Sequence, residues 1–174
     1  MALDKVQLEA EKNVEKENTL DERMVHIDRV ARVVKGGRRF RFRALVVVGD
    51  HKGSIGVGVA KAQDVTGAIS KATDVAKKNM VKVSLYKDTI PHDVQAKVSG
   101  ANVLIKPASS GTGLIAGGVV RILLEVAGVK NALSKSLGSS NKINIAYATV
   151  EALKQLQPQS KWVGAKKSKK AKKA

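Results

Sequence analysis

Seven basic residues and no acid occur between residues 29 and 43, which makes this the stretch of the chain best suited to bind phosphate. Side chains of a strand alternate between its two faces, so Arg39, Arg41 and Arg43 would project from one face in a row. Guanidinium groups donate hydrogen bonds in a fixed fork that matches phosphate oxygens. A row of them without an interleaved carboxylate favours a nucleic-acid surface over an ordinary solvated strand face. The seven residues are Arg29, Arg32, Lys35, Arg38, Arg39, Arg41 and Arg43.

A β-hairpin would hold this basic row in place. Two β-prone runs meet at Gly36 and Gly37, and a glycine pair between such runs is typical of a two-residue hairpin turn. The same alternation predicts that the opposite strand face is a core face, made of Phe40, Phe42, Ala44, Val46 and Val48. We therefore expect one face of the hairpin to pack and the other to bind RNA, with the binding residues extended to Lys52 and Lys61 in the flanking turn and strand.

A possible dinucleotide motif lies in the second half of the chain. Residues 111–116 (GTGLIA) match G-x-G-x-x-G/A, which binds a pyrophosphate when it joins a strand to a helix. That fingerprint also needs an acid about 20 residues further on, and no acid stands between Glu125 and Glu151. The preceding strand is short and broken by Pro107. We predict that no cofactor binds here, although a bare helix N-terminus could still offer amides to an RNA phosphate.

Other catalytic or metal-binding groups are scattered. His26, His51 and His92 have no metal-ligand spacing, and the sequence contains no cysteine. Glu125 is the only acid between residues 94 and 150, so no pair of carboxylates for acid–base chemistry is available there. We therefore predict neither a metal site nor catalytic residues, no small-molecule substrate, and a protein that is not an enzyme.

Composition also favours a polyanionic partner. The 174 residues carry a formal net charge of +17, which favours RNA or DNA as the ligand over acidic lipid. Residues 1–19 are rich in acids, whereas residues 161–174 hold seven lysines and no acid, so both ends read as tails. No apolar run is long enough to span a bilayer, and we expect a soluble, cytoplasmic protein with no membrane partner.

Hydrophobic periodicity predicts an α+β fold of two small α/β domains. In the first, strands at 25–34, 38–48 and 54–60 precede a helix that begins after Asp64 and runs to about residue 80. Gly56 and Gly58 leave one face of the third strand bare, as if another element packs closely there. This unit is β-β-β-α.

The second domain is expected to be a two-layer β-β-β-α-β-α unit. Its strands are predicted at 81–86, 94–98 and 103–105, followed by a helix at 116–127, a strand at 132–137 and a last helix capped by Ser140 or Asn141. The apolar stripe predicted for that last helix is Ile143, Ala146, Tyr147, Val150 and Leu153. The resulting division is a tail at 1–19, domains at 20–83 and 84–157, and a lysine-rich tail at 158–174.

Several stretches together resemble the fifth protein of the bacterial small ribosomal subunit. They are VKGGR at 34–38, ALVVVGD at 44–50, KKNM at 77–80, KPASSGTGLIAGG at 106–118 and LEVAGV at 124–129. The resemblance covers about residues 20–157 in order, while residues 1–19 and the end of the chain match no pattern of that family.

The resemblance implies a first domain like a double-stranded-RNA-binding fold and a structural role in the small ribosomal subunit. It implies that the protein binds small-subunit rRNA, contacts the fourth and eighth small-subunit proteins, supports assembly, and helps to line the mRNA entry path and to maintain decoding accuracy. The loop at residues 35–38 would lie close to the spectinomycin site, and Arg121 would lie near the contact with the fourth protein. Pattern alone makes Arg121 equally compatible with an ordinary exposed helix face.

Two alternatives remain open at this level. A free-standing RNA chaperone or double-stranded-RNA-binding regulator would share the first domain, and co-sedimentation with small subunits at high salt would separate the two. A dinucleotide-dependent enzyme is the other alternative, and failure to bind a nicotinamide or flavin cofactor would remove it.

Overall fold

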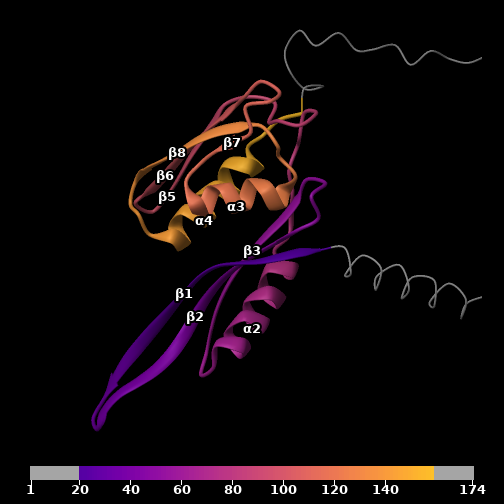
Figure 1. The fold of residues 1–174 in the computed structure, drawn as a ribbon. Coiled ribbons are helices and arrows are strands. Elements are labelled where there is room, and N and C mark those ends of the chain that lie inside the picture. Colours follow the sequence, from indigo (N-terminus) through magenta and orange to yellow (C-terminus); the bar gives the residue numbers. More distant parts are fainter. Residues whose placement is uncertain (1–19, 159–174) are drawn as a thin grey trace, which may run out of the picture.

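The computed structural model describes residues 20–158, which form two four-stranded sheets and three helices stacked in layers (Figure 1). The first sheet has the order β1-β2-β3-β4, and helix α2 covers one of its faces. Helices α3 and α4 lie between its other face and the second sheet, whose order is β5-β6-β8-β7. The predicted α+β class is confirmed. The first sheet and α2 comprise β1 (Asp21–Val34), β2 (Gly37–Gly49), β3 (Ser54–Ala62), α2 (Val65–Lys78) and β4 (Val81–Lys82). The other elements are β5 (Val94–Val98), β6 (Ala101–Pro107), β7 (Leu114–Ile115), α3 (Gly118–Ala127), β8 (Ala132–Gly138) and α4 (Lys142–Lys154).

Strands β1 and β2 form the predicted antiparallel hairpin, but its turn is one residue earlier than expected. Val34 pairs with Gly37, so the two turn residues are Lys35 and Gly36. Gly37 alone adopts positive φ there, at +138°. Glycine reaches this region without the steric cost of a Cβ, which explains why a glycine follows the turn.

Helix α2 packs very closely on β3, as the glycines of that strand predicted. A methyl group built on Gly58 would overlap the carbonyl oxygen of Ala72, and one on Gly56 would overlap that of Ala76. The helix begins after Asp64 as expected, although the Asp64 side chain makes no capping hydrogen bond. Small residues on both elements therefore let the helix backbone approach the sheet.

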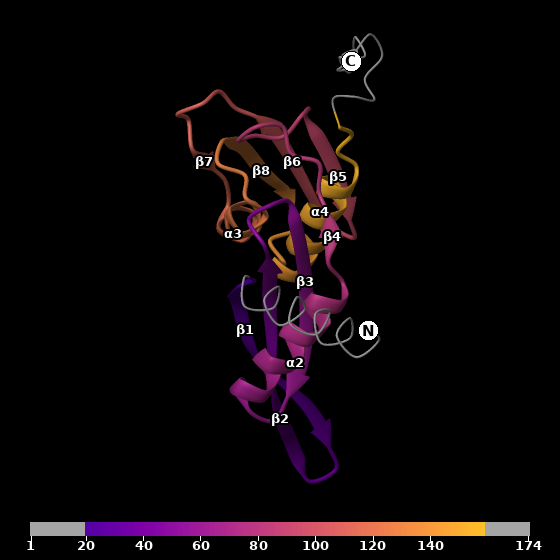
Figure 2. The same ribbon diagram turned by 90° about the vertical axis from the view of Figure 1, so that its right-hand side faces the viewer.

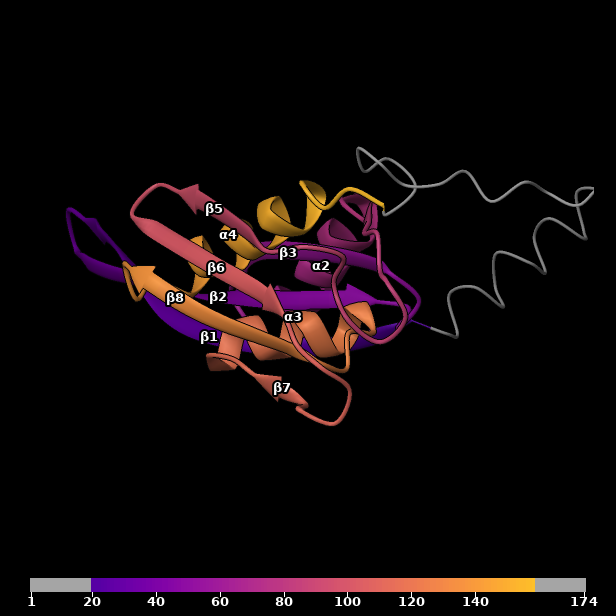
Figure 3. The same ribbon diagram turned by 90° about the horizontal axis from the view of Figure 1, so that it is seen from above.

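The second sheet does not contain the first of the three strands that were predicted before its helix. Of the strand predicted at 81–86, only Val81–Lys82 is extended, and it pairs with β3 in the first sheet. The pairing ends because Lys82 lies opposite Ser54, where β3 itself begins. The third strand of the β-β-β-α-β-α unit is instead β7, a two-residue strand parallel to β8 that lies just before the predicted helix, where no strand was predicted. Figure 3 shows β5, β6 and β8 side by side over the helices.

Helix α4 is buried on more than one side because it lies between the two sheets. Asn141 caps it by accepting a hydrogen bond from the Ile143 N–H at 3.1 Å, which settles the choice between Ser140 and Asn141. The predicted stripe was wrong at Tyr147, which is exposed, whereas Ile145 is buried. Two contact surfaces on one helix blur the single apolar stripe that sequence periodicity detects.

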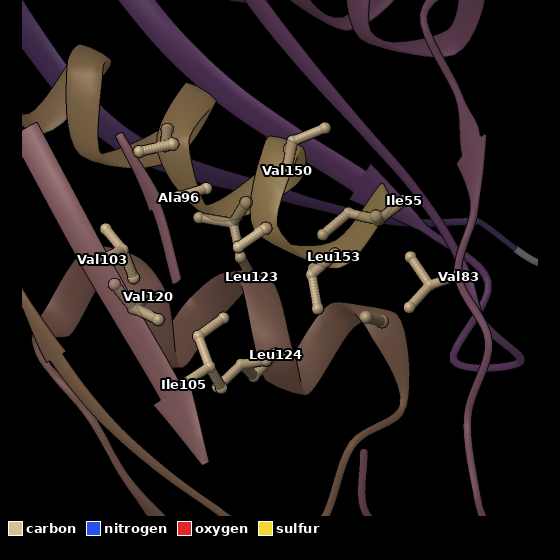
Figure 4. Packing of buried hydrophobic residues seen from close by; sticks show 14 of the residues in the cluster. Ile55, Val83, Ala96, Val103, Ile105, Val120, Leu123, Leu124, Val150 and Leu153 are labelled. Atoms are coloured by element: carbon tan, nitrogen blue, oxygen red, sulfur yellow. The ribbon is translucent and has the colours of Figure 1, made fainter. Parts of the chain in front are cut away.

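Strand β2 separates two hydrophobic clusters. Ala44, Val46 and Val48 face α2, whereas Leu45 and Val47 belong to a larger cluster that includes α3, α4 and the second sheet. Figure 4 shows Ile55 and Val83 beside Leu153 of α4, with Leu123, Leu124, Val103 and Ile105 further along the same cluster. One continuous core therefore joins the two domains.

The turn between β2 and β3 also binds the C-terminal end of α3. The N–H groups of His51 and Gly53 donate to the carbonyl oxygens of Val126 and Ala127, at 3.1 and 3.0 Å. Gly128 ends α3 at φ +90°, and a Cβ there would overlap the His51 carbonyl group. Backbone hydrogen bonds therefore reinforce the shared core.

Candidate nucleic-acid interface

The distal end of the β1–β2 hairpin projects beyond the helices that cover the rest of the first sheet (Figures 1 and 2). Every residue from 31 to 41 is exposed. β3 extends only as far as Ala62, which pairs with Phe42, so no third strand of residues 20–158 accompanies the hairpin beyond that point. Both faces of this arm are therefore available to a ligand.

One face of the arm forms a basic groove. Arg32 lies opposite Arg39 in the ladder, Arg41 is two residues further along β2 on the same face, and Lys61 of β3 lies beside them. They line a hollow of about 480 Å³ together with Val30, Ala31 and Val34. We call Arg32, Arg39, Arg41 and Lys61 the arginine groove. None of the residues lining the hollow is acidic, so their charges are available to an anionic ligand.

Arg43 differs from the other members of the predicted row because a carboxylate neutralises it. Its Nη2 lies 2.7 Å from Oδ2 of Asp28, its partner in the ladder. The hydrogen bond from Arg43 lowers the pKa of Asp28, with a further contribution from His26, while partial burial opposes the shift. The turn expected at Gly36 and Gly37 would have placed Val30 opposite Arg43, and only the observed turn at Lys35 and Gly36 puts Asp28 there. We therefore leave Arg43 out of the arginine groove.

The opposite face of the arm corrects the predicted core. Phe40 was expected in the core but is 47% exposed, and Arg29 lies over its ring at 3.8 Å from the centroid. Phe42, on the same face, packs against the α2 cluster. The alternation was right, but the core face ends at Phe42, because none of the described helices and strands covers the hairpin beyond it.

The remaining predicted binding residues lie in three places. Lys35 and Gly36 form the tip of the arm, with Gly37 next to them. Arg38 pairs with Val33 on the Phe40 face. Lys52 is at the opposite end of the sheet, in the turn that contacts α3, so the structure does not bring it together with the arginine groove.

Arg121 lies on an exposed part of α3, with a side chain that is 59% exposed. Its Nε donates to Oε1 of Glu125 at 3.1 Å, and Nη1 of Arg23 binds Oε2 of the same carboxylate at 2.7 Å. Burial lowers the pKa of Arg23, but Asp21 and Glu125 outweigh it, so the net shift is upward. Glu125, the only acid between residues 94 and 150, thus serves as an ion-pair partner for two arginines.

The G-x-G-x-x-A motif does not form a dinucleotide-binding turn. Residues Leu114–Ile115 within it are strand β7, and α3 begins only at Gly118. The Gly113 N–H donates to Oδ1 of Asn131 at 3.0 Å, so this amide is already used within the fold. The helix start that the fingerprint needs is absent from the motif, which argues against the dinucleotide-dependent enzyme.

Within residues 20–158, no group of three or more His, Cys, Asp or Glu side chains could hold a metal ion. None of the helices in the described range is long and apolar enough to cross a membrane.

Two protein-family models match this chain. Residues 20–84 match ribosomal protein S5, N-terminal domain, and residues 96–163 match ribosomal protein S5, C-terminal domain. The first match contains the hairpin and α2, and the second contains α3, α4 and most of the second sheet. The chain therefore belongs to the ribosomal protein S5 family, whose members are structural, RNA-binding proteins of the small ribosomal subunit.

Proposed function

We propose that the protein binds small-subunit rRNA through the arginine groove. The observation that supports this best is the arrangement of Arg32, Arg39, Arg41 and Lys61 on an exposed arm, around a hollow with no acidic residue in its lining. Guanidinium forks bind phosphate oxygens in pairs, and the groove presents three of them beside a lysine. Double-stranded RNA is recognised largely through phosphate and sugar contacts, which such a surface can supply.

The binding test uses the full chain and small-subunit rRNA over a range of salt concentrations. Because bound phosphates release counterions, each lost contact should reduce the slope of log affinity on log salt by about 0.7–0.9. The double variant Arg39→Gln/Arg41→Gln should therefore bind more weakly and with a slope smaller by about 1.4–1.8.

A matched control removes the same charge elsewhere. Lys97→Gln/Lys135→Gln changes two exposed lysines on the second sheet, away from the hairpin. This control should leave the slope close to that of the unchanged protein. Equal losses in the two double variants would show that only net charge matters, and the groove would then not be the binding surface.

We further propose the finer roles that the resemblance implies. The protein supports assembly of the small subunit, mRNA entry and decoding accuracy in the cytoplasm, and contacts the fourth and eighth small-subunit proteins. The exposed position of Arg121 supports a contact with the fourth protein through α3. Cross-linking within purified small subunits tests these neighbours directly, and cross-links from α3 to other proteins alone would overturn the assignment.

A further inference from the structure

Phe40 is an aromatic side chain on the face of the hairpin arm opposite the arginine groove, and hydrophobic packing in the described residues does not explain its position. Phe40 is 47% exposed and belongs to neither hydrophobic cluster, although the whole chain contains only two phenylalanines. Val33, on the same strand face, is 75% exposed. Exposing apolar side chains to water opposes folding, so hydrophobic packing within residues 20–158 explains the position of neither residue.

The ring of Phe40 is paired with a cation. The guanidinium carbon of Arg29 lies 3.8 Å from the ring centroid, close enough for a cation–π contact. Arg29 is itself exposed, and no acid of the described residues forms an ion pair with it. The two side chains therefore form an exposed stack of a planar cation and an aromatic ring.

We propose that Arg29 and Phe40 form a stacking site for one unpaired RNA base. Unstacked bases bind to proteins by stacking on aromatic rings or on arginine guanidinium planes, and this pair offers both. The positive charge of Arg29, with Arg38 two residues from Phe40 on the same strand face, favours a nucleotide over an apolar protein segment. Every base has a π-face, so this site selects unpaired bases without selecting their identity.

The two faces of the arm then recognise different parts of one RNA. The arginine groove takes phosphates of a paired region, while the Arg29–Phe40 stack takes a base that has left the helix. The ligand of the whole arm is accordingly a junction between duplex and single strand. This inference rests on the proposed function of the groove, so its test must separate the two faces.

The test compares two RNA probes bound to the full chain. One probe is a single-stranded oligoadenylate of about 10 nucleotides that carries 2-aminopurine, and the other is a blunt RNA duplex of about 16 base pairs. Phe40→Leu keeps an apolar side chain but removes the π-face, and it should weaken binding of the single strand by about fivefold or more. It should leave the salt slope and the affinity for the duplex unchanged, and 2-aminopurine should lose its stacking signal.

Phe40→Tyr restores a ring and should restore both the affinity and the stacking signal. An unchanged affinity of Phe40→Leu for the single strand would overturn the proposal, and so would a failure of Phe40→Tyr to restore it. An equal loss on the duplex would also overturn it, because the ring would then act through the shape of the arm. Arg39→Gln/Arg41→Gln reports separately on the groove: unchanged duplex binding in that variant would refute the proposed function but not the stacking site.

Discussion

Gly37 and Gly36 provide a matched pair of substitutions at the tip of the hairpin arm. A Cβ built on either residue has no heavy atom within 4 Å, so neither substitution creates a clash. Only Gly37 has a positive φ, at +138°. Gly37→Val and Gly36→Val therefore differ in backbone strain and in little else.

The strain in Gly37→Val follows from the conformation of that one residue. An L-residue forced into positive φ costs about 1–2 kcal/mol, and a β-branched side chain resists it most. Because the tip lies outside both hydrophobic clusters, the arm can relieve this strain by opening the Val34–Gly37 pair instead of unfolding the domain. We expect the midpoint of denaturant unfolding to change little, while the tip residues Lys35 and Arg38 move.

Three measurements test this reasoning. Amide exchange at residues 31–41 should accelerate in Gly37→Val and stay unchanged in Gly36→Val, and binding to small-subunit rRNA should weaken only in the former. Given the position that the resemblance implies for this loop, we also expect cells with Gly37→Val to be less sensitive to spectinomycin while their ribosomes still assemble. Equal effects of the two substitutions would refute the strain argument. Wild-type drug sensitivity despite a displaced tip would show that no drug site lies nearby, and loss of the protein from the subunit would show that the loop serves assembly first.

Three other predictions concern separate parts of the fold. Gly58→Ala should lower the free energy of unfolding by about 1–3 kcal/mol, because its methyl group would overlap the backbone of α2. Gly67→Ala has 3.6 Å to the nearest atom and should raise the free energy of unfolding by about 0.5–1 kcal/mol. Denaturant unfolding that gives both substitutions the same sign would contradict this. The hydrogen bond from Arg43 lowers the pKa of Asp28, so its stabilisation is present above the unfolded carboxyl pKa of about 3.9 and is lost as the pH falls through the lower folded value. Asp28→Asn should therefore cost less than about 1 kcal/mol at neutral pH and nothing in acid, and a difference that persists at low pH would exclude this ion pair as its cause. Arg121→Leu should raise misreading in a reporter assay without unfolding the protein, because the exposed side chain contributes no core packing, and unchanged fidelity in assembled subunits would contradict the proposed contact.

Local patterns in the sequence predicted most of the fold. Period-two alternation located β1, β2 and β3, and three- and four-residue spacing located α2. Gly56 and Gly58 correctly indicated a close helix, because missing side chains are visible in the sequence itself. These signals depend only on neighbours along the chain.

The errors arose where distant segments decide the outcome. Phe40 obeys the alternation of its strand, but whether that face is covered depends on where β3 ends. The predicted stripe of helix α4 was wrong at Tyr147 and missed Ile145, because a second sheet also packs against this helix. Strand β7 forms only because β8 lies alongside it. At the proposed binding surface, the basic residues could be named from the sequence, whereas the neutralisation of Arg43 by Asp28 depends on the register of the hairpin.

Strand β2 contributes side chains to both hydrophobic clusters, so the order of synthesis decides when its two faces become covered. Translation completes β2 and β3 first, with Leu45, Val47, Ile55 and Val57 facing helices that do not yet exist. Some 90 residues separate the end of β3 from the end of α4, which corresponds to roughly 5–20 s of elongation. During that interval the nascent chain carries an uncovered hydrophobic sheet face, which invites chaperone binding or aggregation. A message truncated after residue 84 would make this exposure permanent, even though its product would contain the whole β1–β2 hairpin.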